Sequence, residues 1–168
     1  MTEEEWATSG SAQDMLQSLR ETHPEFLATQ VSQLHKFLIA CSWKHQHLIP
    51  QKGLRDGLRA ADSWVAGKIG DEKLYRVNWY AEAEAFGIDY AETPDELAEL
   101  ESLIAGIDEL RALPFADARE RLLAAAYFAE GAMVYPKLRR LPWSHRLFTS
   151  PFLCPALLRE YVRPTFGS

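Results

Sequence analysis

Apolar side chains recur every three or four residues through most of the chain, the spacing that gathers them on one face of an α-helix. This periodicity is found in residues 24–48, 51–66, 71–86, 94–112 and 117–133, and shorter helical patterns occupy 12–19 and 155–162. No segment shows the sustained alternation of apolar and polar residues that is typical of a strand. The pattern predicts an all-α protein, a bundle of about six helices in a single domain, without a substantial sheet.

Residues that cap helices support several of these boundaries. Thr93-Pro94-Asp95-Glu96 combines a capping hydroxyl, a proline at the first helical position and a glutamate that can bond back to the cap. Thr22-His23-Pro24-Glu25 has the same elements and predicts the start of another helix. Asp71 predicts an N-cap, and Gly87 predicts the end of the helix that follows it.

The last 33 residues differ in character from the rest of the chain. They contain five of the nine prolines, and only residues 155–162 have a helical pattern. We therefore expect residues 1–135 to form the helical domain. Residues 136–168 are expected to form an irregular, proline-rich, basic C-terminal extension that packs on this domain.

Composition places the chain among ordinary globular proteins and excludes several functional classes. The 168 residues are 47% hydrophobic and 25% charged, with a net charge of −6, which argues against a protein that binds nucleic acid over its whole surface. The only two cysteines, Cys41 and Cys154, are too few and too far apart for a disulfide scaffold. No apolar run approaches the length of a membrane span, and the acidic start at residues 2–6 is unlike a signal peptide. These features predict a cytoplasmic, acidic protein.

Charge is distributed unevenly along the sequence. Residues 77–110 contain no lysine or arginine but ten carboxylates, whereas residues 137–168 carry six basic side chains and one acid. We expect the basic extension to fold back over the acidic segment 82–109, held mainly by its apolar side chains, because exposed ion pairs contribute little stability.

Several short motifs resemble a set of uncharacterised planctomycete proteins. The similar segments are Thr2-Glu3-Glu4-Glu5-Trp6, Leu34-His35-Lys36-Phe37-Leu38-Ile39-Ala40-Cys41, Asp71-Glu72-Lys73-Leu74 and Leu157-Leu158-Arg159-Glu160. Those relatives often carry several cysteines after the Ala-Cys position, where this chain has Ser42 and Trp43. The resemblance implies a helical fold, and it supplies no activity and no metal role.

The candidate chemistry is weak. Cys41 and His45 are four residues apart and would share a helix face, as paired metal ligands do, but Cys41 belongs to an apolar stripe and no second ligand pair occurs. Cys154 has no marked partner base, and the paired carboxylates are expected to lie on solvated faces. We therefore predict no catalytic site, no metal site and no cofactor.

Two functions remain open. The first is a non-enzymatic protein-interaction module, such as a small subunit or adaptor in a larger complex, and the alternative is a nucleic-acid-associated protein that contacts phosphates through the basic and aromatic C-terminal segment. The candidate partner-binding residues are Lys137, Arg139, Arg140, Trp143, Arg146, Trp64 and Trp79. The same arginines could instead only neutralise the acidic helices, and the two tryptophans, which lie beside their helix stripes, could form the rim of the core.

Overall fold

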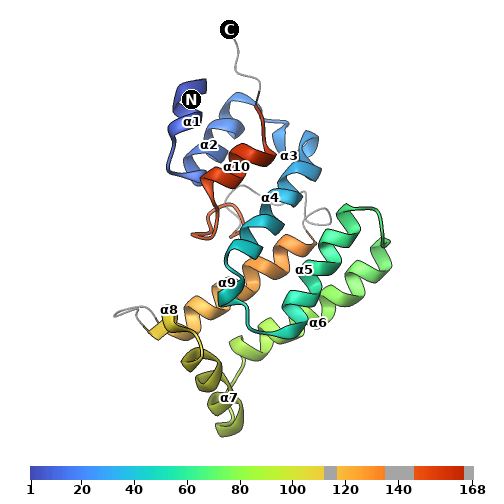
Figure 1. The fold of residues 1–168 in the computed structure, drawn as a ribbon, viewed down its shortest axis with the longest axis vertical. Coiled ribbons are helices and arrows are strands. Elements are labelled where there is room, and N and C mark those ends of the chain that lie inside the picture. Colours follow the sequence, from blue (N-terminus) through green and yellow to red (C-terminus); the bar gives the residue numbers. More distant parts are fainter. Residues whose placement is uncertain (112–116, 135–145, 165–168) are drawn as a thin grey trace.

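The fold is known from a computed structural model, which describes residues 1–111, 117–134 and 146–164 (Figure 1). Helices make up most of these residues, and six of them are 11 residues or longer. In chain order the elements are α1 (Glu3–Thr8), α2 (Ala12–Thr22), α3 (Phe26–Thr29), α4 (Val31–Lys44), the 3₁₀ helix η1 (Gln46–Leu48), α5 (Lys52–Val65), α6 (Asp71–Asp89), α7 (Pro94–Ala105), α8 (Asp108–Arg111), α9 (Ala118–Met133) and α10 (Pro155–Tyr161). Over the described residues there is no strand, and the prediction of an all-α domain is confirmed.

Helices α4 and α9 occupy the middle of the molecule. The N-terminal helices α1 to α3 lie with α10 at one end, and α7 and α8 lie at the other (Figure 1). Helix α5 packs on α4, α6 and α9. Helix α6 packs on α5 and α9 and forms an outer layer over them. None of the helices in the described ranges is long and apolar enough to cross a membrane.

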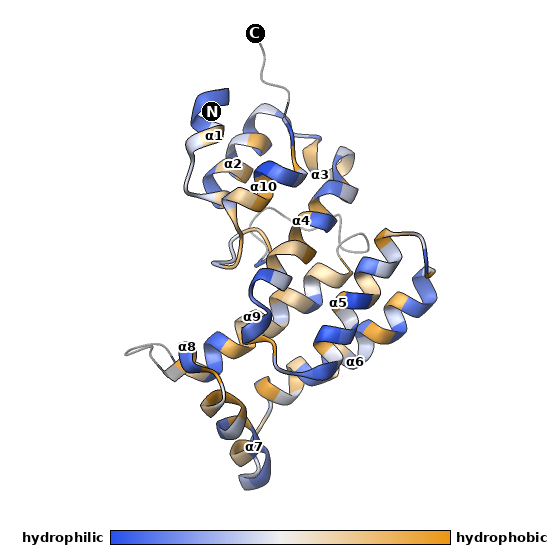
Figure 2. Cartoon of the chain, in the orientation of Figure 1, coloured by the Kyte–Doolittle hydropathy of each residue, from blue (hydrophilic) through white to orange (hydrophobic). Residues whose placement is uncertain are grey.

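The core follows from the stripes that the sequence predicts. Its largest fully buried side chains include Phe37, Leu34, Leu38, Leu54 and Leu58 from α4 and α5. Part of the connection between α4 and α5 is also hydrophobic (Figure 2), and its residues Leu48 and Ile49 are buried.

Several predicted helix ends differ from the structure. The capping box at Thr93 is confirmed, since its hydroxyl accepts from the Glu96 amide at 3.3 Å and the Glu96 carboxylate accepts from the Thr93 amide at 2.9 Å. The expected box at Thr22 is wrong, because the Thr22 hydroxyl donates to the carbonyl of Ser18 inside α2. Gly87 does not end α6, which continues to Asp89.

The C-terminal extension, over its described residues 146–164, packs on the helical domain. Leu147, Phe152 and Leu158 are almost fully buried. The Gln13 amide donates to the Thr149 carbonyl at 2.7 Å, and Arg159 donates to the Trp6 carbonyl at 3.1 Å and the Ser9 carbonyl at 2.9 Å. These contacts lie on and next to α1 and on α2, α10 packs on α4, and Phe152 and Leu147 meet Phe128 and Gly131 of α9. These contacts of residues 146–164 therefore lie away from the acidic segment 82–109, which we expected the extension to cover. Apolar burial and carbonyl acceptors, rather than carboxylates, determine where it packs.

Candidate functional site

Helix α6 is apolar on two sides. Its inner side buries Leu74, Ala81, Ala85 and Ile88 against the domain. On the outer side Trp79, Ala83, Phe86 and Tyr90 follow one another at steps of four, three and four residues, which aligns them along the helix. We call the outer residues Trp79, Tyr80, Phe86 and Tyr90 the aromatic face.

The rings of the aromatic face are open to solvent. Exposed fractions are 65% for Trp79, 57% for Tyr80, 42% for Phe86 and 67% for Tyr90. Among the described residues only Met1 and Leu97 are other exposed large hydrophobic side chains, at 37% each. Over the described residues, exposed large apolar side chains are therefore concentrated on α6 and its C-cap residue Tyr90. A group of large rings left unburied on one helix is the arrangement that marks interaction surfaces, whereas isolated exposed apolar residues are ordinary.

The rings contact one another in pairs. Trp79 and Tyr80 meet edge to face with centroids 5.4 Å apart, and Phe86 meets Tyr90 in the same way at 5.8 Å. Such pairs restrict the side chains before any partner arrives, which lowers the entropy that binding has to overcome.

The aromatic face continues onto α9. The rings of Phe86 and Tyr127 are 6.3 Å apart, and the Tyr127 hydroxyl donates to the Asp89 carboxylate at 2.6 Å. Burial of the phenol and its bond to Asp89 raise the pKa of Tyr127 to about 12, so this donor stays protonated over the whole physiological range. The Arg146 guanidinium lies 4.4 Å from the Tyr127 ring centre and forms the edge of the surface.

Two polar contacts hold α6 against α9 and keep the aromatic face turned outward. Arg119 donates to the carbonyls of Ile88 at 2.9 Å and Asp89 at 2.8 Å, which satisfies the C-terminal end of α6. Nearer the middle of the helix, the Asn78 amide donates to the Glu130 carboxylate at 3.0 Å. The face is thus fixed at both positions by groups from α9.

The surroundings of the aromatic face are acidic. From Val77 to Leu110 the chain has ten carboxylates and no basic residue, and this stretch includes most of α6 and all of α7. The Arg119 guanidinium at the end of α6 is used by backbone carbonyls. A partner of this surface therefore meets rings flanked mainly by carboxylates, with Arg146 at one edge and Arg76, which pairs with Glu72, one turn before Trp79.

The structure distributes the predicted site residues differently. Trp79 belongs to the aromatic face, and Arg146 lies at its edge. Trp64 is only partly exposed, because its indole donates to Asp71 at 2.7 Å and its ring packs edge-on against His35 at 5.4 Å. Trp64 therefore acts in packing at the end of α5. The remaining four candidates, Lys137, Arg139, Arg140 and Trp143, lie outside the described residues.

The sequence reasoning did not find Tyr80, Phe86 and Tyr90. A signal for Phe86 and Tyr90 was present, since together with Trp79 and Ala83 they form a second apolar stripe on the side of α6 opposite the core stripe. Tyr80 lies outside this stripe. A helix with two apolar stripes and charged residues between them has one side for the core and one for another surface.

The histidines and cysteines that the structure describes are spread over separate contacts. No group of three or more candidate ligands exists over the described residues. His47 instead pairs with the Glu109 carboxylate at 2.5 Å, and this contact holds η1 to α8.

Cys154 has a partner that the sequence did not reveal. The Lys44 ammonium donates to the Cys154 sulfur at 3.0 Å. Burial opposes the thiolate, but Lys44 and the backbone amides of Leu157 and Ala156 outweigh it and lower the pKa of Cys154. Burial raises the pKa of Cys41 to about 12. Cys154 is only 6% exposed, so the arrangement favours a stabilised thiolate with little access for a substrate.

Comparison of the chain with profiles of known protein families, with curated proteins and with solved structures gave no match. The resemblance to planctomycete proteins stays a prediction from the sequence.

Proposed function

We propose that the protein is a non-enzymatic interaction module, in the role of a small subunit or adaptor, and that the aromatic face of α6 binds a basic, amphipathic segment of another protein. The observation that carries this proposal is the alignment of exposed rings along a helix that already has a complete buried side. Exposure of these apolar rings to water is unfavourable. A partner that covers them removes a large apolar area from solvent, which favours binding.

The side chains of the face are those that dominate protein interfaces. Tryptophan and tyrosine are enriched among residues whose truncation weakens binding by about 2 kcal/mol or more. They offer rigid apolar area together with a polar edge, so they tolerate exposure while the partner is absent. Trp79, at 65% exposure, is the residue that we expect to contribute most.

Charge indicates what kind of partner fits. The carboxylates of residues 77–110 would attract lysines and arginines that flank an apolar stripe, and an arginine can also stack on the rings. A second copy of the same helix would bring like charges together, so the charge pattern disfavours a dimer through this face. The proposed occupant is therefore a foreign basic segment.

A pair of model peptides tests the proposal. One is an amphipathic helix of leucine and lysine heptads, and the other is the same sequence with every lysine replaced by glutamate. We expect calorimetric titration to show binding of the lysine peptide only. The double variant Trp79→Ser/Phe86→Ser should weaken it by about 30-fold, the equivalent of 2 kcal/mol. The matched control Leu97→Ser, an exposed apolar residue on α7, should bind like the unchanged protein.

The opposite results are equally clear. Equal binding of both peptides, or unchanged affinity in the double variant with an unchanged thermal midpoint, would contradict a role for the aromatic face. Binding of a single-stranded oligonucleotide that falls linearly on a log–log salt plot, and that the double variant retains, would instead favour the nucleic-acid alternative.

A further inference from the structure

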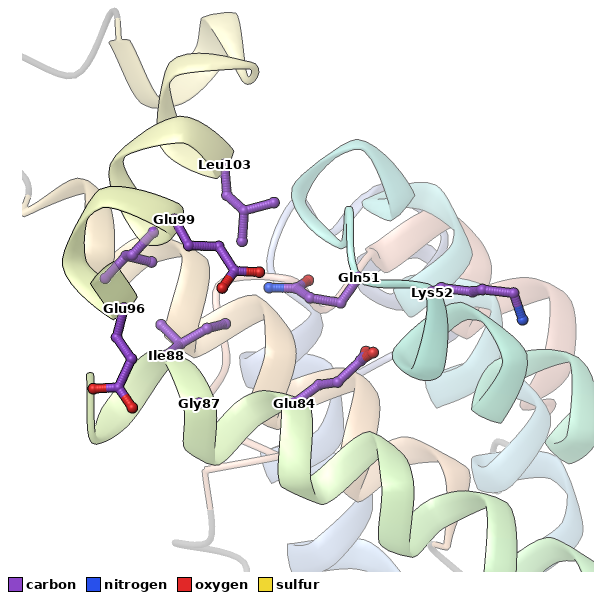
Figure 3. Close-up of a pocket in the computed structure, with 9 residues that line it drawn as sticks. Gln51, Lys52, Glu84, Gly87, Ile88, Glu96, Glu99 and Leu103 are labelled. Carbon is purple, nitrogen blue, oxygen red and sulfur yellow. The ribbon is translucent and has the colours of Figure 1, made fainter. Parts of the chain in front are cut away.

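A separate cavity lies where α5, α6 and α7 meet. Its volume is about 400 Å³, which is within the range of small-molecule sites. Its lining comprises Gln51, Lys52, Glu84, Gly87, Ile88, Glu96, Glu99, Leu100 and Leu103. Figure 3 shows polar groups from Gln51, Glu84 and Glu99 on one part of the cavity and the apolar Ile88 and Leu103 on another.

The amide group of Gln51 is unsatisfied in this cavity. Its oxygen and its nitrogen are both shielded from solvent, and neither has a hydrogen-bond partner among the described residues. A buried amide without partners is costly, so its presence beside a cavity calls for a group that it can bind. Gln51 precedes α5 and makes no side-chain cap bond, so local helix capping does not account for it.

Glu84 is held in place by the start of α5. Its carboxylate accepts from the Leu54 amide at 3.0 Å, so it takes the place of a capping side chain. Gly53 allows this approach, because a Cβ at that position would lie 2.7 Å from the carboxyl carbon of Glu84. The bond uses one oxygen of Glu84, and Figure 3 shows the carboxylate reaching toward Gln51.

The charge in the cavity is not balanced. Glu99 has no hydrogen bond or ion pair with any described residue, and in Figure 3 its carboxylate points toward Gln51. Glu96 is engaged by the Thr93 and Glu92 amides. The Lys52 ammonium pairs with Asp56 and points away from the cavity. Glu99 and the free oxygen of Glu84 therefore leave net negative charge beside the Gln51 amide, whose nitrogen is turned toward Glu99 in Figure 3.

We propose that this cavity binds an ammonium or guanidinium group carried on an apolar stem. The cationic nitrogen donates to Glu99 and, once the Gln51 amide has turned by half a rotation, to its oxygen, while the stem lies along Ile88, Leu100 and Leu103. Charge-assisted hydrogen bonds of this kind are about twice as strong as neutral ones, so they provide selectivity for cations. The site rests on different residues from the aromatic face and stands independently of it.

Such a group can belong to a free amine or to a lysine side chain of a polypeptide. Two probes separate these sources: n-hexylamine, and lysine blocked as its N-acetyl methylamide. Hexanol and hexanoate serve as neutral and charge-reversed controls with the same stem. We expect ligand-observed NMR of the full chain to show binding of hexylamine with an affinity at least about tenfold above that of hexanol, and no binding of hexanoate. Comparable binding of blocked lysine would assign the site to a lysine side chain of a polypeptide partner. If blocked lysine does not bind, the site is assigned to a free amine.

Three variants test the geometry. Glu99→Gln should weaken hexylamine binding by about tenfold, whereas Glu101→Gln, an exposed carboxylate on the same helix that does not line the cavity, should leave it unchanged. Gln51→Met should also weaken binding but keep or raise the thermal midpoint, since it removes a buried amide that has no partner. The proposal is overturned if hexylamine binds no better than hexanol, or if Glu99→Gln and Glu101→Gln behave alike.

Discussion

His35 shows how one buried polar residue shapes the chemistry of the core. Its ring is fully buried in α4, with Nε2 at 3.0 Å from the Met133 carbonyl of α9, while Nδ1 has no partner among the described residues. Nε2 therefore carries the proton of a neutral imidazole. Burial lowers the pKa of His35 to about 4, against the opposing bonds to the Met133 and Ala132 carbonyls.

This pKa predicts a pH dependence of stability. Between pH 6.5 and pH 4 the unfolded chain binds a proton at His35 and the native protein does not, so the free energy of unfolding falls as the pH is lowered through this window. The full loss is about 3 kcal/mol at 1.36 kcal/mol for each pH unit. Urea unfolding at several pH values in this window measures how steeply the free energy of unfolding changes with pH. This change should be smaller in His35→Gln, which keeps a donor for Met133. The exposed His23→Gln variant should keep the pH dependence of the unchanged protein. The same pH dependence in the unchanged protein and both variants would contradict the role of His35.

At the scale of helices, small residues decide how closely elements approach. Helix α9 buries Ala125, Ala126, Ala129 and Ala132 against its neighbours. Gly57 of α5 faces Met133, and a Cβ there would lie 2.4 Å from the Met133 sulfur and 3.4 Å from the Ala81 Cβ. The junction of α5, α6 and α9, on which the aromatic face rests, depends on this contact.

Two glycine substitutions should therefore have opposite effects. Alanine normally stabilises a helix relative to glycine by roughly 0.5–1 kcal/mol. Gly87→Ala in α6 has nothing within 4 Å of the new methyl group and should raise the denaturation midpoint. Gly57→Ala should lower it, because overpacking against Met133 costs about 1–3 kcal/mol. Denaturant unfolding of both variants measures the difference, and a stabilised Gly57→Ala variant would mean that α5 and α9 lie farther apart than the structure places them.

The positions of the helices could be predicted from the sequence, whereas the way in which they pack on one another could not. Periodicity located the long helices because each has a strong stripe of core residues. The box at Thr93 was found because all of its contacts are local. The true end of α6 was missed because Arg119, 30 residues after Asp89, supplies the terminal contacts. The Lys44–Cys154 contact and the cavity at Gln51 join segments that are distant in the chain, so no local pattern could indicate them. The aromatic stripe was visible in the sequence, but its exposure depends on how α6 packs.

At the scale of the whole molecule, the structure separates a closed side from an open one. The N-terminal helices, α10 and residues 146–154 cover α4 and one side of α9 with apolar packing. Helix α6 lies on the other side, supported from within by α5 and α9 and uncovered on its aromatic face. The proposed function requires that the aromatic face on this open side binds a partner.

The indole resonances of the tryptophans test this central claim most directly. Trp43 and Trp64 have indole groups bound to Asp62 at 2.8 Å and Asp71 at 2.7 Å, whereas Trp79 is the exposed member of the aromatic face. In an ¹⁵N NMR titration with the lysine and leucine peptide, with Trp79 assigned from Trp79→Phe, we predict that the Trp79 indole signal shifts saturably while those of Trp43 and Trp64 do not. A Trp79 signal that stays unchanged while the peptide binds, or that shifts equally with the glutamate peptide, would contradict the claim that α6 recognises a basic partner.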